Sequence, residues 1–122
     1  MDSKEYGLMI LETTTSVDMK TASKTTLYTV PTGKTAYICF VIVRDPSGTL
    51  AGGTDYGFGT DAGCTTWVDG VSLAKLVSTD NFEVIGSGLY TECTAGDAFG
   101  IYPNTGSTAS ATATIDVIGF IK

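Results

Sequence analysis

The chain has 122 residues, of which 43% are hydrophobic and 16% charged, with a formal net charge of −6 and no histidine. This length suits one domain that forms a core without disulfide bonds, and 15 glycines with no long helix-forming stretch favour short strands joined by turns. Only seven lysines and arginines are available to neutralise phosphates, which excludes DNA and RNA as partners.

The N-terminal region predicts a strand arm on a polar tether. Residues 6–12 are short and apolar, and residues 13–24 are predicted as a linker that either arches between two sheets or stays mobile. We therefore divide the chain into an arm with its linker, residues 1–24, and a β-sandwich domain, residues 25–122. The start has no secretory-signal pattern, and no segment approaches the roughly 18 apolar residues of a membrane span. We expect cytoplasmic synthesis and no membrane partner.

Residues 25–44 predict a β-hairpin. Pro31 and Gly33 supply the fixed φ and the positive φ that a tight turn uses. The second strand is apolar on both faces, with alternating sets of side chains: Ala36, Ile38, Phe40 and Ile42 against Tyr37, Cys39, Val41 and Val43. Such a strand is either central in a sheet covered on both sides, or packs one face on the core and the other on another subunit.

The remaining sequence predicts further short strands. A glycine-rich segment, residues 50–64, surrounds two aromatic residues; residues 71–77 fit either a strand or one helical turn; and residues 107–122 predict a long closing strand. About seven to nine strands at regular turn spacing predict an all-β fold. We expect a two-sheet antiparallel, jelly-roll-like sandwich with an N-terminal strand arm, and an up-and-down barrel is the alternative.

No residue pattern predicts an enzyme or a cofactor. Without histidine, the usual general base of hydrolases and the commonest metal ligand are missing. Most acidic residues stand beside Gly or Pro, where solvated turn residues are expected. A calcium ion held by Asp55, Asp61 and Asp69 is a minor alternative, because their spacing matches no EF-hand. We therefore predict no catalytic residue, no metal and no cofactor.

Cysteine and aromatic residues leave two questions open. The three cysteines lack C-x-x-C spacing and are expected to be reduced, although Cys64 and Cys93 could meet in space. The aromatic residues are expected in the core or at subunit contacts. A sugar-stacking platform is the alternative, formed by Trp67, Tyr28, Tyr56, Tyr90 and Tyr102.

Four segments, in order, resemble small virion proteins of tailed bacteriophages. They are LYTVPTGKTAYICFVIVRDPSGT, AGGTDYGFGTDAGCTTW, AGDAFGIY and ATATIDVIGFIK, which lie within residues 25–122. The family is that of the capsid decoration, or cement, proteins, which are small, β-rich and often trimeric. The resemblance implies a structural virion protein that is made in the host cytoplasm, binds the major capsid protein as a homotrimer, and stabilises the head surface on which it is located.

Partner contacts are expected from the arm, from the doubly apolar strand and from the tryptophan: Tyr6, Leu8, Met9, Ile10, Leu11, Tyr37, Val41 and Trp67. The arm is expected either to join a neighbour's sheet by β-augmentation or to form an edge of its own sheet. Two other functional classes remain open. One is a receptor- or carbohydrate-binding head or tail fibre domain, with host surface glycan as its partner, and the other is a cellular interaction module.

Overall fold

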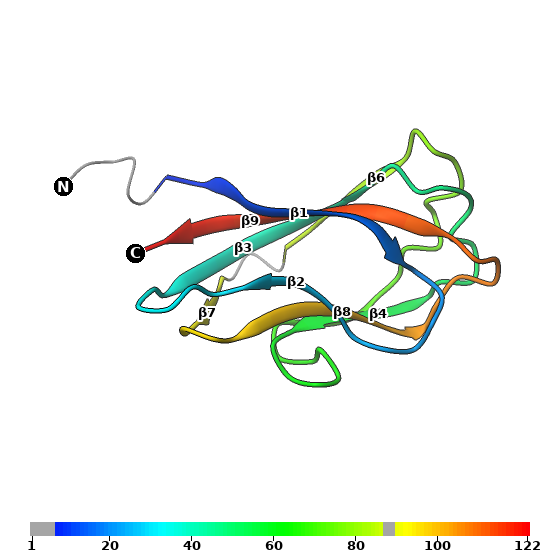
Figure 1. The fold of residues 1–122 in the computed structure, drawn as a ribbon. Coiled ribbons are helices and arrows are strands. Elements are labelled where there is room, and N and C mark those ends of the chain that lie inside the picture. Colours follow the sequence, from blue (N-terminus) through cyan, green and yellow to red (C-terminus); the bar gives the residue numbers. More distant parts are fainter. Residues whose placement is uncertain (1–6, 87–89) are drawn as a thin grey trace.

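The fold was analysed in a computed structural model that describes residues 7–86 and 90–122. Two antiparallel sheets pack face to face, and the described residues contain no helix, so none that could cross a membrane (Figure 1). This arrangement confirms the predicted all-β, two-sheet sandwich. The strands are β1 (Met9–Asp18), β2 (Thr25–Thr29), β3 (Ala36–Arg44), β4 (Asp55–Gly59), β5 (Val68–Val71), β6 (Phe82–Ile85), β7 (Thr91–Cys93), β8 (Ala98–Thr105) and β9 (Thr112–Ile121).

The strand order is that of a jelly roll. One sheet has the order β1-β9-β3-β6, with β7 also paired to β3, and the other has the order β2-β8-β4-β5. β6 and β7 pair with different halves of β3 in the same direction, so they form a single edge strand that is interrupted between Ile85 and Thr91. Counted this way, eight strands form the two sheets, as expected for a double-sheet jelly roll.

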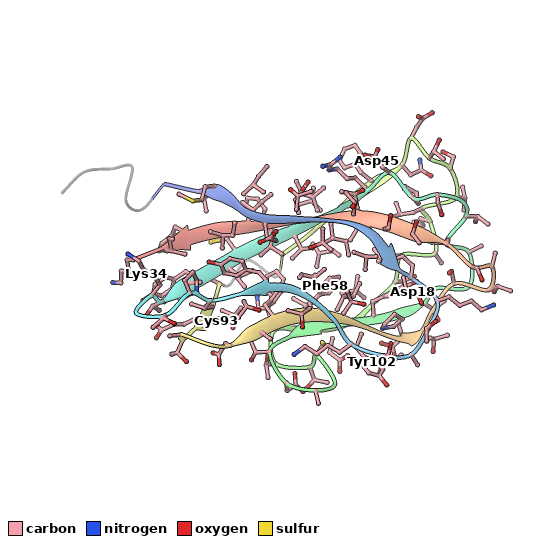
Figure 2. All side chains as sticks on the ribbon, in the orientation of Figure 1. Asp18, Lys34, Asp45, Phe58, Cys93 and Tyr102 are labelled. Carbon is pink, nitrogen blue, oxygen red and sulfur yellow. The ribbon has the colours of Figure 1, made fainter. Side chains whose placement is uncertain are left out.

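The core lies between the two sheets and includes residues from both ends of the chain. Phe58, labelled in Figure 2, lies between the layers and is fully buried. The hydroxyl of Tyr56 donates a hydrogen bond of 2.7 Å to the Met19 carbonyl, so the four-stranded sheet is tied to the segment that follows β1. Val17 and Met19 belong to the same core cluster as residues of β9.

The linker predicted for residues 13–24 is wrong over residues 13–18, which are part of β1. β1 pairs with β9 of its own chain from Met9 to Asp18, with register shifts near Leu11 and before Val17. An edge strand needs apolar side chains on one face only, so this polar, threonine-rich sequence pairs without a continuous apolar pattern. The strand ends where the Asp18 carboxylate accepts the N–H groups of the next turn.

The hairpin predicted for residues 25–44 is also wrong. β2 pairs with β8 and β3 pairs with β9, so the turn at Pro31 and Gly33 connects two sheets rather than two paired strands. The turn itself forms as expected, because Lys34 N–H donates to the Pro31 carbonyl at 3.1 Å and Gly33 has φ 76°. A tight turn fixes the reversal of the chain but not the sheet that the next strand joins.

Residues 71–77 form neither of the predicted alternatives. β5 ends at Val71, and a turn follows in which Leu76 N–H donates to the Leu73 carbonyl at 3.1 Å. Both leucines are buried beneath this connection. The regular spacing of apolar residues in this segment therefore belongs to a loop whose leucines cover the end of the core, and not to a strand or a helix.

Candidate interaction surface

The outward side of the five-stranded sheet is apolar across its full width. Residues opposite each other in an antiparallel ladder share a face, and Ile10 lies opposite Ile118, which also lies opposite Phe40. Ile42 lies opposite Val84 in the same way. The apolar side chains on or beside this side, called here the outer sheet face, are Leu8, Ile10, Tyr37, Phe40, Ile42, Phe82, Val84, Tyr90, Ile118 and Phe120.

A β-bulge in β3 decides which side chains reach the outer sheet face. The ladder with β9 shifts register between Ile38 and Phe40, so Cys39 is the extra residue. As a result, Val41 and Val43 follow Ile38 into the core, while Phe40 and Ile42 point outward. The predicted alternation is therefore wrong beyond Ile38. Val41, predicted as a partner contact, is fully buried in the core.

Most exposed large hydrophobic side chains of the described chain belong to the outer sheet face. Ile10 is 60% exposed on β1, Phe82 is 65% and Val84 53% exposed on β6, and Leu8 and Tyr90 are similarly accessible. Because β1 and β6 are the two flanks of the sheet, the most accessible side chains surround a less accessible centre. Singly scattered apolar residues are ordinary on a protein surface, but a continuous set is a mark of an interaction site.

Aromatic rings pack together at one end of the outer sheet face. Tyr37 stacks on Phe120 with ring centroids 4.8 Å apart, and Tyr90 meets Tyr37 edge to face at 5.5 Å. The Nζ atom of Lys122 lies 5.6 Å from the centre of the Tyr37 ring. These contacts fix the ring orientations before any partner arrives, which reduces the entropy lost on binding.

One ion pair lies at the other end of the same face. The Asp116 carboxylate accepts a hydrogen bond of 2.8 Å from Arg44 Nε and one of 2.7 Å from Thr13 Oγ1. The hydrogen bond from Arg44 is the main reason why the pKa of Asp116 lies below its ordinary value, while burial opposes this shift. Arg44 also donates to Asp45 at 2.7 Å. The charge of Asp116, which is only 5% exposed, is therefore balanced within the chain.

The predicted partner residues lie in several places. Leu8, Ile10 and Tyr37 lie on the outer sheet face, together with side chains of two other strands, β6 and β9. Met9 is 42% exposed but alternates to the other side of β1, and Leu11 packs against the core. Tyr6 lies outside the described residues.

Trp67 does not belong to this surface. Its ring packs on Phe99 of the four-stranded sheet, with centroids 5.7 Å apart. The sugar-stacking platform predicted as an alternative is also not assembled, because Tyr28 and Tyr56 are buried in the core. Tyr102 donates its hydroxyl hydrogen to the Ala22 carbonyl at 3.1 Å. The predicted aromatic set is thus divided between the core and two different sheets.

Sequence reasoning missed the β6 flank of the surface. Phe82 and Val84 were not among the residues predicted to contact a partner. Their spacing of two residues was a usable signal, since side chains two apart in a strand share a face. The apolar residues near the end of β9 gave a similar signal for Ile118 and Phe120.

The outward side of the four-stranded sheet has a different construction. The loop of residues 60–67, in green below β4 in Figure 1, folds back along that strand. A Cβ atom at Gly57 would meet the Cys64 carbonyl oxygen, and one at Gly59 would lie 2.6 Å from the Thr66 nitrogen. The glycines of β4 therefore allow the chain to cover this side with its own backbone.

The described part of the chain contains neither an assembled metal-binding site nor a disulfide bond. No group of three or more metal-binding side chains occurs between residues 7 and 86 or 90 and 122. Asp61 instead accepts the Thr65 N–H at 2.6 Å within a local turn, and hydrogen bonds from Thr65 lower the pKa of this carboxyl. The three cysteines are free, and burial raises the pKa of Cys93 to about 11.

The two outward sides of the sandwich therefore present unlike surfaces: one is covered along β4 by the chain's own loop, and the other is apolar and open. No protein-family model, curated protein or solved structure gives a significant match to the chain. The outer sheet face holds five of the seven exposed large hydrophobic side chains of the described residues, and we take it as the candidate functional site.

Proposed function

We propose that the chain is a structural virion protein, a capsid decoration or cement protein that binds a phage head as an oligomer and stabilises it. The observation that carries this proposal is the outer sheet face. It is broad and apolar, its buried carboxylate Asp116 is already paired with Arg44, and it lacks the convergent polar groups that orient a small ligand. Such a surface suits contact with another protein chain, which a decoration protein that acts as an oligomer needs both between its own copies and with the capsid.

The fold and the resemblance support the same proposal. Double-sheet jelly rolls recur in viral capsid domains, although a fold alone does not specify a function. The segment LYTVPTGKTAYICFVIVRDPSGT contains the whole of β3, and the segment ATATIDVIGFIK contains the whole of β9. These two segments are among those that resemble decoration proteins, and they form the centre of the outer sheet face.

A decoration protein needs no reaction chemistry. It bridges neighbouring capsid subunits and adds buried apolar area at their junctions, and the part of that burial free energy that exceeds the entropy and desolvation costs of binding stabilises the shell. This added area raises the free energy needed to separate the subunits when packaged DNA presses outward. The proposed partner is the major capsid protein of the same phage.

The test uses purified full-length chain and expanded, empty capsids of the phage that encodes it. We expect the chain to co-sediment with the capsids and to raise their disruption temperature, measured by calorimetry or by light scattering. An unrelated β-sandwich protein of similar size and charge is the control. Absence of co-sedimentation and an unchanged disruption temperature would overturn the proposal. Binding to host cells or host glycans, with no effect on capsids, would favour a receptor-binding fibre domain instead.

A further inference from the structure

We propose that the outer sheet face is the contact surface between copies of this chain, so that a second copy covers Ile10, Val84 and the strands between them. The inference rests on the proposed function only for the expectation of an oligomer. It adds which surface forms the contact and what occupies it. The capsid would then be bound by other surfaces of the assembled oligomer.

The exposed apolar area approaches the size of a standard protein–protein contact. Side chains of this size have about 150 to 250 Å² of surface when aromatic and somewhat less when aliphatic. The five that are more than half exposed therefore present roughly 500 to 600 Å², which equals the largest patch of a typical monomer. The half-buried members between them raise the total toward the about 800 Å² that each partner contributes to a standard interface.

The polar groups on the face do not prevent it from being covered. Burying a charge without its partner is costly, but Asp116 already has its bonds to Arg44 and Thr13 within the chain. A second copy would therefore cover a paired group at Asp116, while the exposed Glu92, opposite Tyr37 on the edge strand β7, would lie at the rim of the contact.

The edges of both sheets are poorly suited to joining copies. β1 has two register shifts, β2 has one, and β5 is only four residues long. The remaining edge is interrupted between β6 and β7. Bulges and short strands disrupt the ladder that a new strand would extend. Contact through a face, in the manner of two packed sheets, is the route that this architecture leaves open.

Two valines provide a matched test. Val84 is 53% exposed on the outer sheet face, and Val77 is 56% exposed in the connection before β6. The full-length chain and its Val84→Lys and Val77→Lys variants are compared by size-exclusion chromatography with light scattering across micromolar concentrations. We expect the wild type and Val77→Lys to be oligomers. Val84→Lys should dissociate, with an association constant at least about tenfold lower, because a lysine charge would enter an apolar interface.

Ile10→Lys, on the opposite flank, serves as a second variant, and circular dichroism checks that each variant is folded. A monomeric wild type would overturn the inference, as would an oligomer that both Val84→Lys and Ile10→Lys leave intact. Equal dissociation by Val77→Lys would also contradict it. An oligomer that Val84→Lys dissociates, but that binds no capsid, would support this inference while overturning the proposed function.

Discussion

The ion pair on the outer sheet face gives the sharpest prediction for stability. Asp116→Asn keeps the shape of the side chain and an acceptor for Thr13, but removes the charge that holds Arg44 at 2.8 Å. Hydrogen bonds to charged groups contribute about 1.5 to 3 kcal/mol each, and water reaches Arg44, so we expect a loss near the lower end, about 2 kcal/mol in the free energy of unfolding. For a domain of this size, that loss lowers Tm by roughly 8 °C.

The pH dependence separates this charge effect from a packing effect. Because the pKa of Asp116 is lowered in the folded chain, its stabilising contribution is complete above the ordinary carboxyl pKa of about 4 and is lost as pH falls through the lowered folded value. Urea unfolding of wild type and Asp116→Asn, at one protein concentration, should therefore differ at pH 7 and converge as the pH falls through the lowered pKa of Asp116 in the folded chain. Asp45→Asn, at an exposed partner of the same arginine, is the control and should stay within about 0.5 kcal/mol of wild type. Equal stability of Asp116→Asn and wild type at pH 7, or a difference that persists at low pH, would refute this reasoning.

Other parts of the fold give further predictions. Gly59→Ala should lower the free energy of unfolding by about 1 to 3 kcal/mol, because its Cβ would meet the returning loop. Gly48→Ala has open space around its Cβ and should leave the stability nearly unchanged. Urea unfolding midpoints measure both effects. Tyr56→Phe should cost about 1 kcal/mol by thermal unfolding through loss of its buried hydrogen bond to Met19; an unchanged Tm would show that the bond contributes nothing. In a thiol titration at pH 8, Cys39 should react first, because the thiols of the other two cysteines are fully buried. All three thiols should react in denaturant. Three thiols that react equally fast in the folded protein would contradict this order.

The sequence was most informative about the kind of element and least informative about its partners. Turn residues and β-rich runs correctly predicted an all-β sandwich, because these signals are local. The assignment of β2 and β3 to different sheets depends on contacts with β8 and β9, far away in the chain. No pattern within residues 25–44 reports such distant contacts, so a hairpin and a connection between sheets look alike in the sequence.

The candidate site shows the same division between local and distant information. Leu8, Ile10 and Tyr37 were predicted as contact residues because they are apolar in accessible strands, and the structure places them on one face. Trp67 was chosen for its residue type alone, and it packs on Phe99 instead. The residues of one strand can show that both of its faces are apolar, but only the order of the strands shows which apolar faces lie side by side and form one surface.

The bulge at Cys39 explains why β3 departs from simple alternation. Without it, Arg44 would share a face with Ile38 and would carry a charge into the core, where an unpaired charge is very costly. The extra residue reverses the phase, so Arg44 points outward to Asp116 while Val41 and Val43 fill the core. Opposite the bulge stands Gly119, where a Cβ atom would collide with the Tyr37 carbonyl oxygen, so this position accepts the close backbone approach that the bulge creates. The same local irregularity therefore keeps a charge out of the core and moves Phe40 and Ile42 onto the outer sheet face.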